Sequence, residues 1–540
     1  MIGRILIISA LVAVVGIPFL LRPDPERRTE FDAEVVIITP HNEYIRHEFS
    51  RGFRDWYAER TGKVVRVDWR MPGGTSEIAT FLDSEYRASF RLHWERELGE
   101  RWDREIQGAY ANHAIVLSED PADDDRLQRA RRAFLEMDRG VGLDLFFGGG
   151  SFDFIRQARA GRLVPSGLEE RRPEWFTDEV IPLELSGESF RDPQGRWIGA
   201  ALSSFGLIYN RDALGRVAFP GTPTQWVDLT SPLLKGEVAL ADPSKSGSIA
   251  KAFEMVIQQQ MQELVEERNI DPENVPEEVL AEGWLRGLQL VQLMGANARY
   301  FTDAATKPLV DVALGDAATG MAIDFYGRTQ QEALQMRGSD RFGFHTPEGG
   351  STVSVDPIGL LRGAPNREIA VAFMEYVLSP EGQALWNLEP GVEGGPRNYA
   401  LRRLPIRKDF YREEMEPLRS DPGVFPYEMA DSFYYHFAWT GRLFNETRFI
   451  IRVMCLDTHD ELRQAWREII RAGLPPEALE ILQDLSRISY EEVKGTISQE
   501  IRSGDPLDEV RLAKELGNHF RAQYREARRV ARQASGQVGQ

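Results

Sequence analysis

The sequence predicts an α/β protein with more than one domain, because buried-strand patterns repeatedly pass through a glycine- or hydroxyl-rich turn into a helix. The clearest example spans residues 141–155, where a short apolar strand at 143–147 is followed by three glycines and by Ser151, which stands where a helix N-cap is expected. Such a turn leaves backbone N–H groups unpaired at the carboxyl end of a strand, where α/β proteins hold small, often anionic, ligands. A tight turn without any ligand is the alternative interpretation. A chain of 540 residues has material for two or more domains.

The composition is that of an ordinary folded protein, with 42% apolar and 28% charged residues. The formal net charge of −19 argues against a nucleic-acid partner, because a phosphate backbone is met by clustered Lys and Arg. The sequence has a single cysteine, Cys455, so an internal disulfide and a cysteine-based zinc site are both excluded.

The first 30 residues have the pattern of an export signal or a short membrane anchor. Arg4 precedes an apolar run at 5–21, and a charged spacer with prolines follows at 22–30. As a helix the run would extend about 25 Å, slightly less than a hydrocarbon core of about 30 Å. We therefore expect a periplasmic protein. A cleaved signal and a tether retained in the inner membrane by residues 5–21 are both compatible with the pattern.

Two further strand–turn–helix units follow this segment. A strand pattern at 34–39 ends just before His41, and a second strand at 64–69 leads into a Gly-Gly-Thr-Ser turn at 73–76 and a helix. The stretch 84–138 is different, since it is long, charged and helical by pattern. We interpret it as an insertion on the surface.

The same pattern returns in the second part of the chain. Strands at 197–202 and 206–210 have the character of segments that cross between two halves. A strand at 238–241 runs through a Ser- and Gly-rich turn at 242–248 into another helix, and a further strand pattern lies at 316–324. Several of these turns could therefore present hydroxyl and N–H donors to one ligand.

The order of eight short motifs resembles that of the extracellular solute-binding proteins, family 1, which include receptors of ABC importers for ferric iron, polyamines and phosphonates. The motifs are TPHNE, GGTS, DLFFGGGSFDFI, WVDL, KGEVALADPSKSGS, GMAIDFYGR, DPIGLL and AFMEYVLSPEGQALW. They extend over 34–386, and the charged stretches at 84–138 and 262–283 depart from the family pattern. The resemblance implies a two-lobed periplasmic-binding-protein (type II) fold, in which crossing strands join two α/β lobes around a cleft.

The resemblance also implies how the chain is divided, with a helical insertion and a helical C-terminal extension added to the two lobes. The expected parts are 1–30 as signal or membrane anchor and spacer, 31–202 as the first α/β lobe with the insertion at about 84–138, 203–330 as the second α/β lobe, 331–411 as the return to the first lobe, and 412–540 as the helical extension. A cap on the receptor and a docking surface for a permease or membrane are alternative interpretations of the extension.

In this family the ligand lies between the lobes, against helix N-termini and strand ends. The expected ligand-binding residues are His41, Thr75, Ser76, Gly150 and Ser151 from the first lobe, Ser204 from the hinge, and Ser246, Gly247, Ser248, Asp324 and Tyr326 from the second lobe. For each of them a role as a helix cap or in the core is the alternative. Closure of the lobes would exclude water, and the closed, loaded form would be the one that a membrane permease prefers.

The identity of the ligand depends on a comparison with the iron-binding members, which commonly hold Fe(III) with two adjacent tyrosines. This chain has Phe325 and Tyr326 at that place, so one tyrosine is missing. Turns rich in Ser and Gly at helix N-termini suit an anion such as a phosphonate or carboxylate. We favour an anion over ferric iron held by Tyr326, His41 and Asp324. No resident cofactor is expected, since Fe(III) would be a transported ligand.

An enzyme is the rival class of function. The sequence lacks a G-x-S-x-G elbow, an H-E-x-x-H helix, a P-loop and an EF-hand. We therefore expect a monomeric, non-enzymatic receptor that works with an ABC permease and binds no nucleic acid. A membrane-tethered sensor with the same fold is a further alternative.

Overall fold

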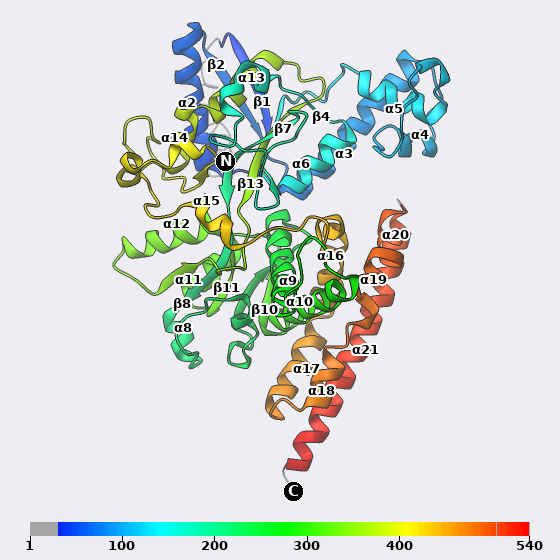
Figure 1. The fold of residues 1–540 in the computed structure, drawn as a ribbon, viewed down its shortest axis with the longest axis vertical. Coiled ribbons are helices and arrows are strands. Elements are labelled where there is room, and N and C mark those ends of the chain that lie inside the picture. Colours follow the sequence, from blue (N-terminus) through cyan, green and yellow to red (C-terminus); the bar gives the residue numbers. More distant parts are fainter. Residues whose placement is uncertain (1–30, 504, 539–540) are drawn as a thin grey trace, which may run out of the picture.

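The computed structural model describes residues 31–503 and 505–538, which build two β-sheets that follow one another along the longest axis of the molecule (Figure 1). The first sheet has the strand order β14–β7–β13–β3–β1–β2, with β4 beside β13. Its strands are β1 (Ala33–Ile38), β2 (Val65–Arg70), β3 (Leu145–Phe147), β4 (Leu163–Val164), β7 (Trp197–Ser203), β13 (Ser354–Leu361) and β14 (Leu404–Pro405). Strands β1, β2 and β3 are parallel, and β13 is antiparallel to β3. The apolar run in β1 is buried, as expected for a parallel strand covered on both faces.

The second sheet has the strand order β10–β9–β11–β8–β12. Its strands are β8 (Phe205–Asn210), β9 (Val238–Ala241), β10 (Ala298–Thr302), β11 (Thr319–Ile323) and β12 (Phe342–His345). The chain crosses from the first sheet to the second between β7 and β8, and it returns between β12 and β13. The expected fold, with two α/β lobes joined by crossing strands, is confirmed.

Helices cover both sheets, and aromatic side chains fill the space beneath them. The helices of the first lobe are α2 (Glu43–Thr61), α3 (Thr75–Leu92), α6 (Ser151–Ala160), α7 (Leu168–Arg171), α13 (Arg367–Leu378) and α14 (Pro380–Asn387). Those of the second are α8 (Arg211–Arg216), α9 (Gly247–Glu267), α10 (Glu277–Asn297), α11 (Lys307–Leu314) and α12 (Asp324–Gln335). In the first lobe the Phe49 ring lies 4.4 Å from that of Trp386 and 5.8 Å from that of Phe147, so α2, α14 and β3 share one core.

The stretch 84–138 forms a helical arm on the side of the first lobe (Figure 1). The last turns of α3 lead into it, and α4 (Arg104–Ala109) and α5 (Arg126–Glu136) complete it. Phe90 stacks on Tyr110 with ring centroids 5.0 Å apart, and Phe134 meets both rings edge-on. These side chains belong to the same apolar cluster as the first sheet, so the arm is packed onto the lobe.

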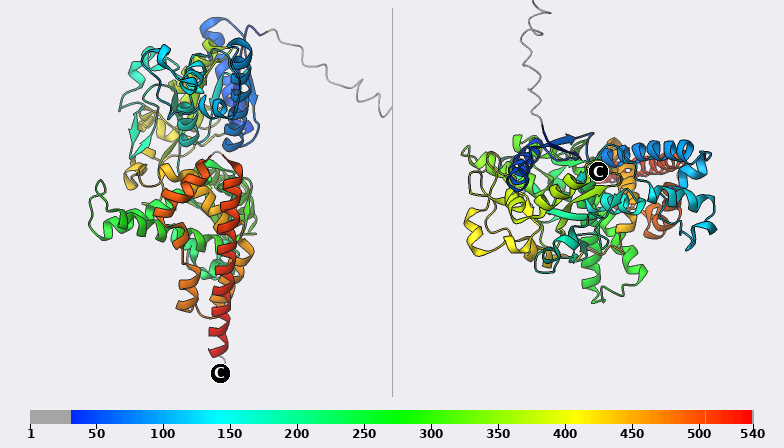
Figure 2. Two further views of the ribbon diagram at one scale, coloured as in Figure 1. Left: turned by 90° about the vertical axis from the view of Figure 1, so that its right-hand side faces the viewer. Right: turned by 90° about the horizontal axis from the view of Figure 1, so that it is seen from above.

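The C-terminal helices share the core of the second lobe. They are α16 (Phe444–Ile451), α17 (His459–Arg471), α18 (Pro476–Leu482), α19 (Tyr490–Glu492), α20 (Ser498–Arg502) and α21 (Pro506–Val538). The short helix α15 (Pro426–Met429) precedes them and packs on the first lobe. The indole of Trp284 in α10 donates to the Ile488 carbonyl at 3.0 Å, and that of Trp466 in α17 donates to Asn297 Oδ1 at 2.7 Å. One apolar cluster joins α9 and α10 to α16, α17 and α21, and α21 then extends away from the lobe (Figure 2).

Two boundaries differ from those expected. Strand β12 pairs with β8, and Phe342 is buried in the second lobe, so the return to the first sheet begins with β13 at Ser354 and not at 331. The segment 413–430 packs on the first lobe, where Ala430 is buried. The helices that join the second lobe therefore begin later than residue 412.

The signal or anchor predicted at 1–30 lies outside the described residues. Within 31–503 and 505–538, no helix combines the length and the apolar character needed to cross a membrane. The longest of these helices, α21, carries charged residues from Asp508 to Arg532.

Candidate functional site

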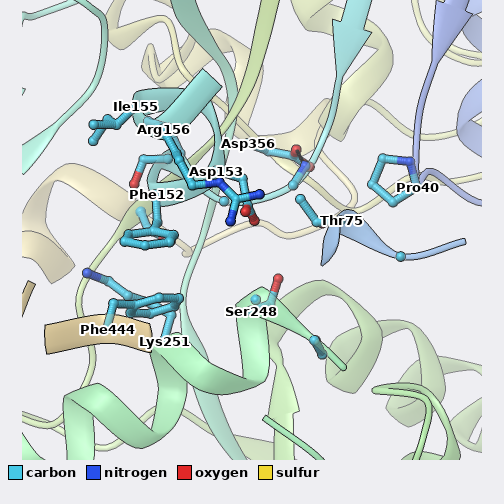
Figure 3. A pocket seen from close by; sticks show the side chains of 18 of the residues that line it. Pro40, Thr75, Phe152, Asp153, Ile155, Arg156, Ser248, Lys251, Asp356 and Phe444 are labelled. Atoms are coloured by element: carbon cyan, nitrogen blue, oxygen red, sulfur yellow. Dashed lines mark hydrogen bonds between the residues drawn. The ribbon is translucent and has the colours of Figure 1, made fainter. Parts of the chain in front are cut away.

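A cavity of about 1450 Å³ lies between the two lobes and is lined by residues of both, as well as by residues of the C-terminal helices. Figure 3 shows Thr75 and Asp356 of the first lobe on the side opposite Ser248 of the second, with Phe152 above Phe444. The turns that follow β1, β3, β9 and β11 all border this cavity. In open α/β sheets, the carboxyl ends of the strands are where ligands bind.

Two helices of the first lobe begin at the cavity without a capping side chain. Gly74 is the N-cap of α3, which starts at Thr75, and Gly150 is the N-cap of α6, which starts at Ser151. Neither glycine has a side chain that could accept a bond from the first turn, so the N–H groups there lack a side-chain cap, and the positive end of the helix dipole faces the cavity. The prediction that Ser151 is the N-cap is wrong by one residue, because Gly150 is the extended residue ahead of the helix.

Helix α9 supplies a third N-terminus from the second lobe. Its N-cap Ser246 accepts a bond from the Ile249 N–H at 3.3 Å, and the helix begins at Gly247. Ser248 is half-buried and lies in the cavity wall. A Cβ on Gly247 would come within 3.3 Å of Asp153 in α6, so the two lobes approach each other closely here.

A buried carboxylate, Asp356 of β13, holds the first-lobe wall of the cavity together. It accepts bonds from His41 Nε2 at 3.1 Å, from the Gly149 N–H at 2.5 Å and from the Arg403 guanidinium. Burial alone would raise the pKa of Asp356, but Arg403 and His41 hold this pKa below its usual value. Asp356 therefore stays charged, and it fixes the positions of three neighbours around the cavity.

Arg403 and Tyr326 bring a cation and a phenol to the same region. The Arg403 guanidinium lies 4.3 Å from the ring centroid of Phe325, and its Nε has no hydrogen-bond partner among the described residues. Burial raises the pKa of Tyr326, so its phenol is held in the neutral form. Sequence reasoning missed Arg403 and Asp356, although Asp356 stands in a visible strand motif and Arg403 in the basic stretch that follows α14.

Another buried charge cluster borders the cavity where the lobes and the C-terminal segment meet. Lys251 Nζ of α9 lies 2.8 Å from Glu188 Oε1, 3.3 Å from Glu254 Oε2 and 3.1 Å from the ring centroid of Tyr435. Glu188 belongs to the first lobe, in a hairpin of β5 (Glu184–Leu185) and β6 (Glu188–Ser189). Burial outweighs Lys251 and raises the pKa of Glu188. This cluster, which sequence reasoning also missed, therefore connects the two lobes.

The C-terminal helix α16 makes direct contacts with the first lobe. Arg448 donates to Ser76 Oγ at 2.8 Å, while it also donates to the carbonyl oxygens of 243–244 at 2.9 and 2.7 Å. Phe444 lies against Phe152 of α6 with ring centroids 4.4 Å apart. The extension therefore takes part in the contact between the lobes.

Most of the residues expected to bind ligand line this one cavity. They are His41, Thr75, Gly150, Ser151, Ser246, Gly247, Ser248 and Tyr326. The two halves of the chain thus bring their glycine- and hydroxyl-bearing turns to the same place. Contact of each residue with a ligand stays a prediction.

Three expected residues lie off the cavity wall, and each has a structural role. Asp324 is buried at the start of α12, where it accepts bonds from the Phe325 N–H at 2.8 Å and from Arg328 at 2.9 Å. Ser204 is 1% exposed in the crossover between β7 and β8. Ser76 is engaged by Arg448 from the other lobe.

The three-residue iron set is consequently not assembled. Tyr326 and His41 line the cavity, but the carboxylate of Asp324 is turned to Arg328 one helical turn along α12. Within the part of the chain that the structure describes, three or more His, Cys, Asp or Glu side chains are nowhere grouped as a metal site requires.

Comparison with known proteins gives the class of the protein. Residues 176–392 match the model of a family described as bacterial extracellular solute-binding protein. This segment includes the second sheet and the strands that join the two lobes. The resemblance noted in the sequence is confirmed at the level of the family.

The curated relatives are similar to part of the chain. An uncharacterized protein of Haemophilus influenzae is 27% identical over 246 residues, which cover 45% of this chain and 60% of the relative. The phosphoglycerate transport regulatory protein PgtC of Salmonella typhimurium is 24% identical over 35% of this chain and 40% of its own length. Iron uptake protein A1 of Synechocystis is 28% identical over 45% of this chain and 62% of its own length. The chain thus spans between two fifths and three fifths of these relatives.

Similar solved structures include iron-bound HitA of Pseudomonas aeruginosa, with a TM-score of 0.47 and 16% identity, covering 78% of this chain and 99% of that one. The periplasmic binding protein AfuA of Actinobacillus pleuropneumoniae, with fructose-6-phosphate bound, has a TM-score of 0.46 and 16% identity, covering 77% of this chain and 97% of its own.

Proposed function

We propose that the protein is the ligand-binding receptor of an ABC importer and that it captures a small organic anion, such as a phosphonate, phosphate ester or carboxylate, in the interlobe cavity. The observation that carries this proposal is the meeting of three helix N-termini, from α3, α6 and α9, around the cavity that Arg403 also lines. Uncapped N–H groups, helix dipoles and a guanidinium all favour negative charge at that place.

Ferric iron is the second candidate ligand, and a specific observation supports it. His41, Asp356 and Tyr326 all line the cavity, and nitrogen and oxygen donors of this kind suit a hard cation. However, Asp356 is already engaged by Arg403 and the Gly149 N–H, and the raised pKa of Tyr326 opposes the phenolate form. The names of the relatives divide in the same way, since one is named a phosphoglycerate transport regulatory protein and another an iron uptake protein. We therefore rank the anion first.

The two-lobed fold provides the mechanism of the proposed receptor. A ligand bound by donors of both lobes would favour the closed form over the open one, and exclusion of water would strengthen each polar contact. The closed, loaded form would then be delivered to a permease in the inner membrane. We propose a periplasmic monomer without enzymatic activity, exported or tethered through residues 5–21. A tethered sensor is the alternative use of the same ligand switch, and measured uptake by the permease would distinguish the two.

The ligand class can be tested by thermal unfolding and calorimetric titration with a panel of phosphonates, 3-phosphoglycerate, citrate and ferric citrate. A ligand at 100 times its Kd adds about 2.7 kcal/mol to the free energy of unfolding, which is readily detected. We expect stabilisation by at least one anion. Binding of Fe(III) together with no response to any of the anions would overturn the ranking.

A single substitution at the second-lobe wall sharpens this test. In Ser248→Asp a carboxylate enters the first turn of α9, where negative charge is favourable for the helix itself but repels an anion in the cavity. We expect the anion affinity to fall by about tenfold or more, which corresponds to about 1.4 kcal/mol. Ser248→Ala is the matched control and should retain most of the affinity. Equal affinities for the two variants would count against an anion at this helix end.

A further inference from the structure

The cavity continues beyond the cleft between the lobes, along α6, into a groove bordered by the two helical additions to the fold. We call this part the arginine groove. Its lining comes from the insertion, from α6 and from the C-terminal helices, and it includes His113, Arg156, Arg159, Arg442 and Arg502. The groove therefore combines α6, a helix of the family pattern, with the insertion and the C-terminal extension, which depart from it.

Helix α6 connects the cleft to the arginine groove as a continuous wall. Phe152, Ile155, Arg156 and Arg159 all line the cavity, and their spacing places them on one face of the helix. At a rise of about 1.5 Å per residue, Arg159 lies about 12 Å along the helix from Ser151. Figure 3 shows the N-terminal part of this face, with Phe152 and Arg156 projecting from α6 into the cavity. The same helix thus offers N–H donors at one end and guanidinium groups two turns later.

The guanidinium groups of the groove are poorly neutralised. In the part of the chain that the structure describes, Arg159 and Arg442 are exposed and neither forms an ion pair. Arg156 reaches Asp83 only at 3.9 Å, since that carboxylate is paired more closely with Arg162, and the buried Nε of Arg156 has no hydrogen-bond partner. Such an excess of positive charge beside a cavity attracts and orients anions.

The pKa of His113 and the ion pair of Glu446 both reflect the positive charge around the groove. Burial lowers the pKa of His113, and Arg159 and Arg131 lower it further. Of the nearby carboxylates, Glu446 is occupied by Arg502 at 2.8 Å. Asp153, buried in the first turn of α6, lies in the same cavity wall near Arg156, and burial raises its pKa. Among the described residues, the unpaired cations of the groove are therefore Arg159 and Arg442.

We propose that the arginine groove is a second anion subsite and that the ligand is an organic molecule with two separated anionic groups. One phosphate or carboxylate would lie at the helix N-termini in the cleft, and the other would lie between Arg156, Arg159 and Arg442. This inference rests on the proposed function of the cleft as an anion site. The chain between the two groups would follow the wall of α6, past Phe152.

A pair of synthetic phosphates tests the proposal directly. Hexane-1,6-diol bisphosphate and hexyl phosphate share one end and the same six-carbon chain, and only the first has a second phosphate. We expect the native protein to bind the bisphosphate about tenfold more tightly by calorimetry. In Arg159→Gln/Arg442→Gln this preference should disappear while hexyl phosphate binds as before, because neither arginine touches the cleft or supports the fold. Arg337→Gln removes an exposed arginine outside the cavity and should keep the preference.

Each result distinguishes the two proposals. Equal binding of both compounds by the native protein would overturn the second subsite and leave the anion receptor standing. If the double variant still prefers the bisphosphate, the second phosphate binds elsewhere, and the proposal that the arginine groove holds it is overturned. Failure of both compounds to bind would overturn the second subsite, whereas the anion receptor itself is decided by the panel of phosphonates, 3-phosphoglycerate and citrate.

Discussion

The two buried charge clusters beside the cavity are built in opposite ways. The Asp356 cluster surrounds one carboxylate with three donors, from His41, Gly149 and Arg403, and all of its members belong to the first lobe. The Lys251 cluster makes two carboxylates share one ammonium, and it joins Glu188 of the first lobe to α9 of the second. One cluster lies within a single lobe, and the other spans the two.

This difference shows which contacts can change when the lobes move. The Asp356 cluster stays intact in any rotation of the lobes, so it acts as a preformed wall for the ligand. In the Lys251 cluster, Glu188 Oε1 and Glu254 Oε2 both lie within ion-pair distance of one ammonium, so two buried carboxyl groups share a single cation. A buried charge that is incompletely satisfied costs free energy. Separation of the lobes would therefore remove this unfavourable free energy at the Lys251 cluster, and it would leave the Asp356 cluster unchanged.

The largest expected effect comes from breaking the Asp356 cluster. Arg403→Met removes the main cation from a buried carboxylate, and we expect a loss of about 3–5 kcal/mol in the free energy of unfolding, measured by urea denaturation. Lys251→Met should cost less, because Glu188, with its raised pKa, can take up a proton. Arg337→Met, at an exposed site, is the control and should change stability by less than about 0.5 kcal/mol. A larger loss for Lys251→Met than for Arg403→Met would contradict the comparison.

The second prediction uses the opposite pKa shifts of the two clusters. The pKa of Asp356 is lowered in the folded protein, so its contribution is present above about pH 4, the unfolded value, and is lost as the pH falls through the folded pKa. The pKa of Glu188 is raised, so its contribution is present below about pH 4.3 and is lost as the pH rises through the folded pKa. The two carboxyl groups therefore change the free energy of unfolding in opposite directions as the pH rises.

Stability measured from pH 3 to pH 8 separates these two contributions. Relative to Asp356→Asn, the native protein should lose stability at the acid end. Relative to Glu188→Gln, it should lose stability as the pH rises above about 4.3. If both variants follow the native curve in parallel, neither carboxyl titrates as the clusters require.

The contrast between the clusters also explains what the sequence could predict. The strand–turn–helix units around Thr75, Gly150 and Ser246 are local, because each strand, turn and helix start is adjacent in the chain. These patterns therefore predicted both lobes and most of the cavity wall. Asp324 was placed wrongly, although Arg328, its partner one helical turn later, stands in the same sequence window.

The missed residues depend on contacts between distant segments. Asp356 meets His41 across 315 residues, and it reaches Arg403 only because β14 returns to the edge of the first sheet beside β7. Lys251 meets Glu188 only because a hairpin of one lobe reaches the other, and Tyr435 joins them from the C-terminal segment. Hydrophobic periodicity gives no information on such pairings, since it reports the face of one element and not its neighbour in space.

The smallest of the expected effects tests whether the C-terminal extension takes part in closure. Ser76→Ala removes the acceptor of the interlobe bond from Arg448, while Arg448 keeps its bonds to the carbonyl oxygens of 243–244 in its own lobe. One charge-assisted hydrogen bond contributes about 1.5–3 kcal/mol, and exposure to water in the open form reduces the difference between the two states to about 1 kcal/mol. We expect ligand affinity to fall by about fivefold, and small-angle X-ray scattering should show a larger radius of gyration for the ligand-free variant. Thr80→Ala, which removes a hydroxyl of the same helix that bonds within α3 and not across the lobes, is the control. If Ser76→Ala leaves both measurements unchanged, Arg448 serves only to anchor α16 to the turn before α9, and the extension is a cap with no part in the closure of the lobes.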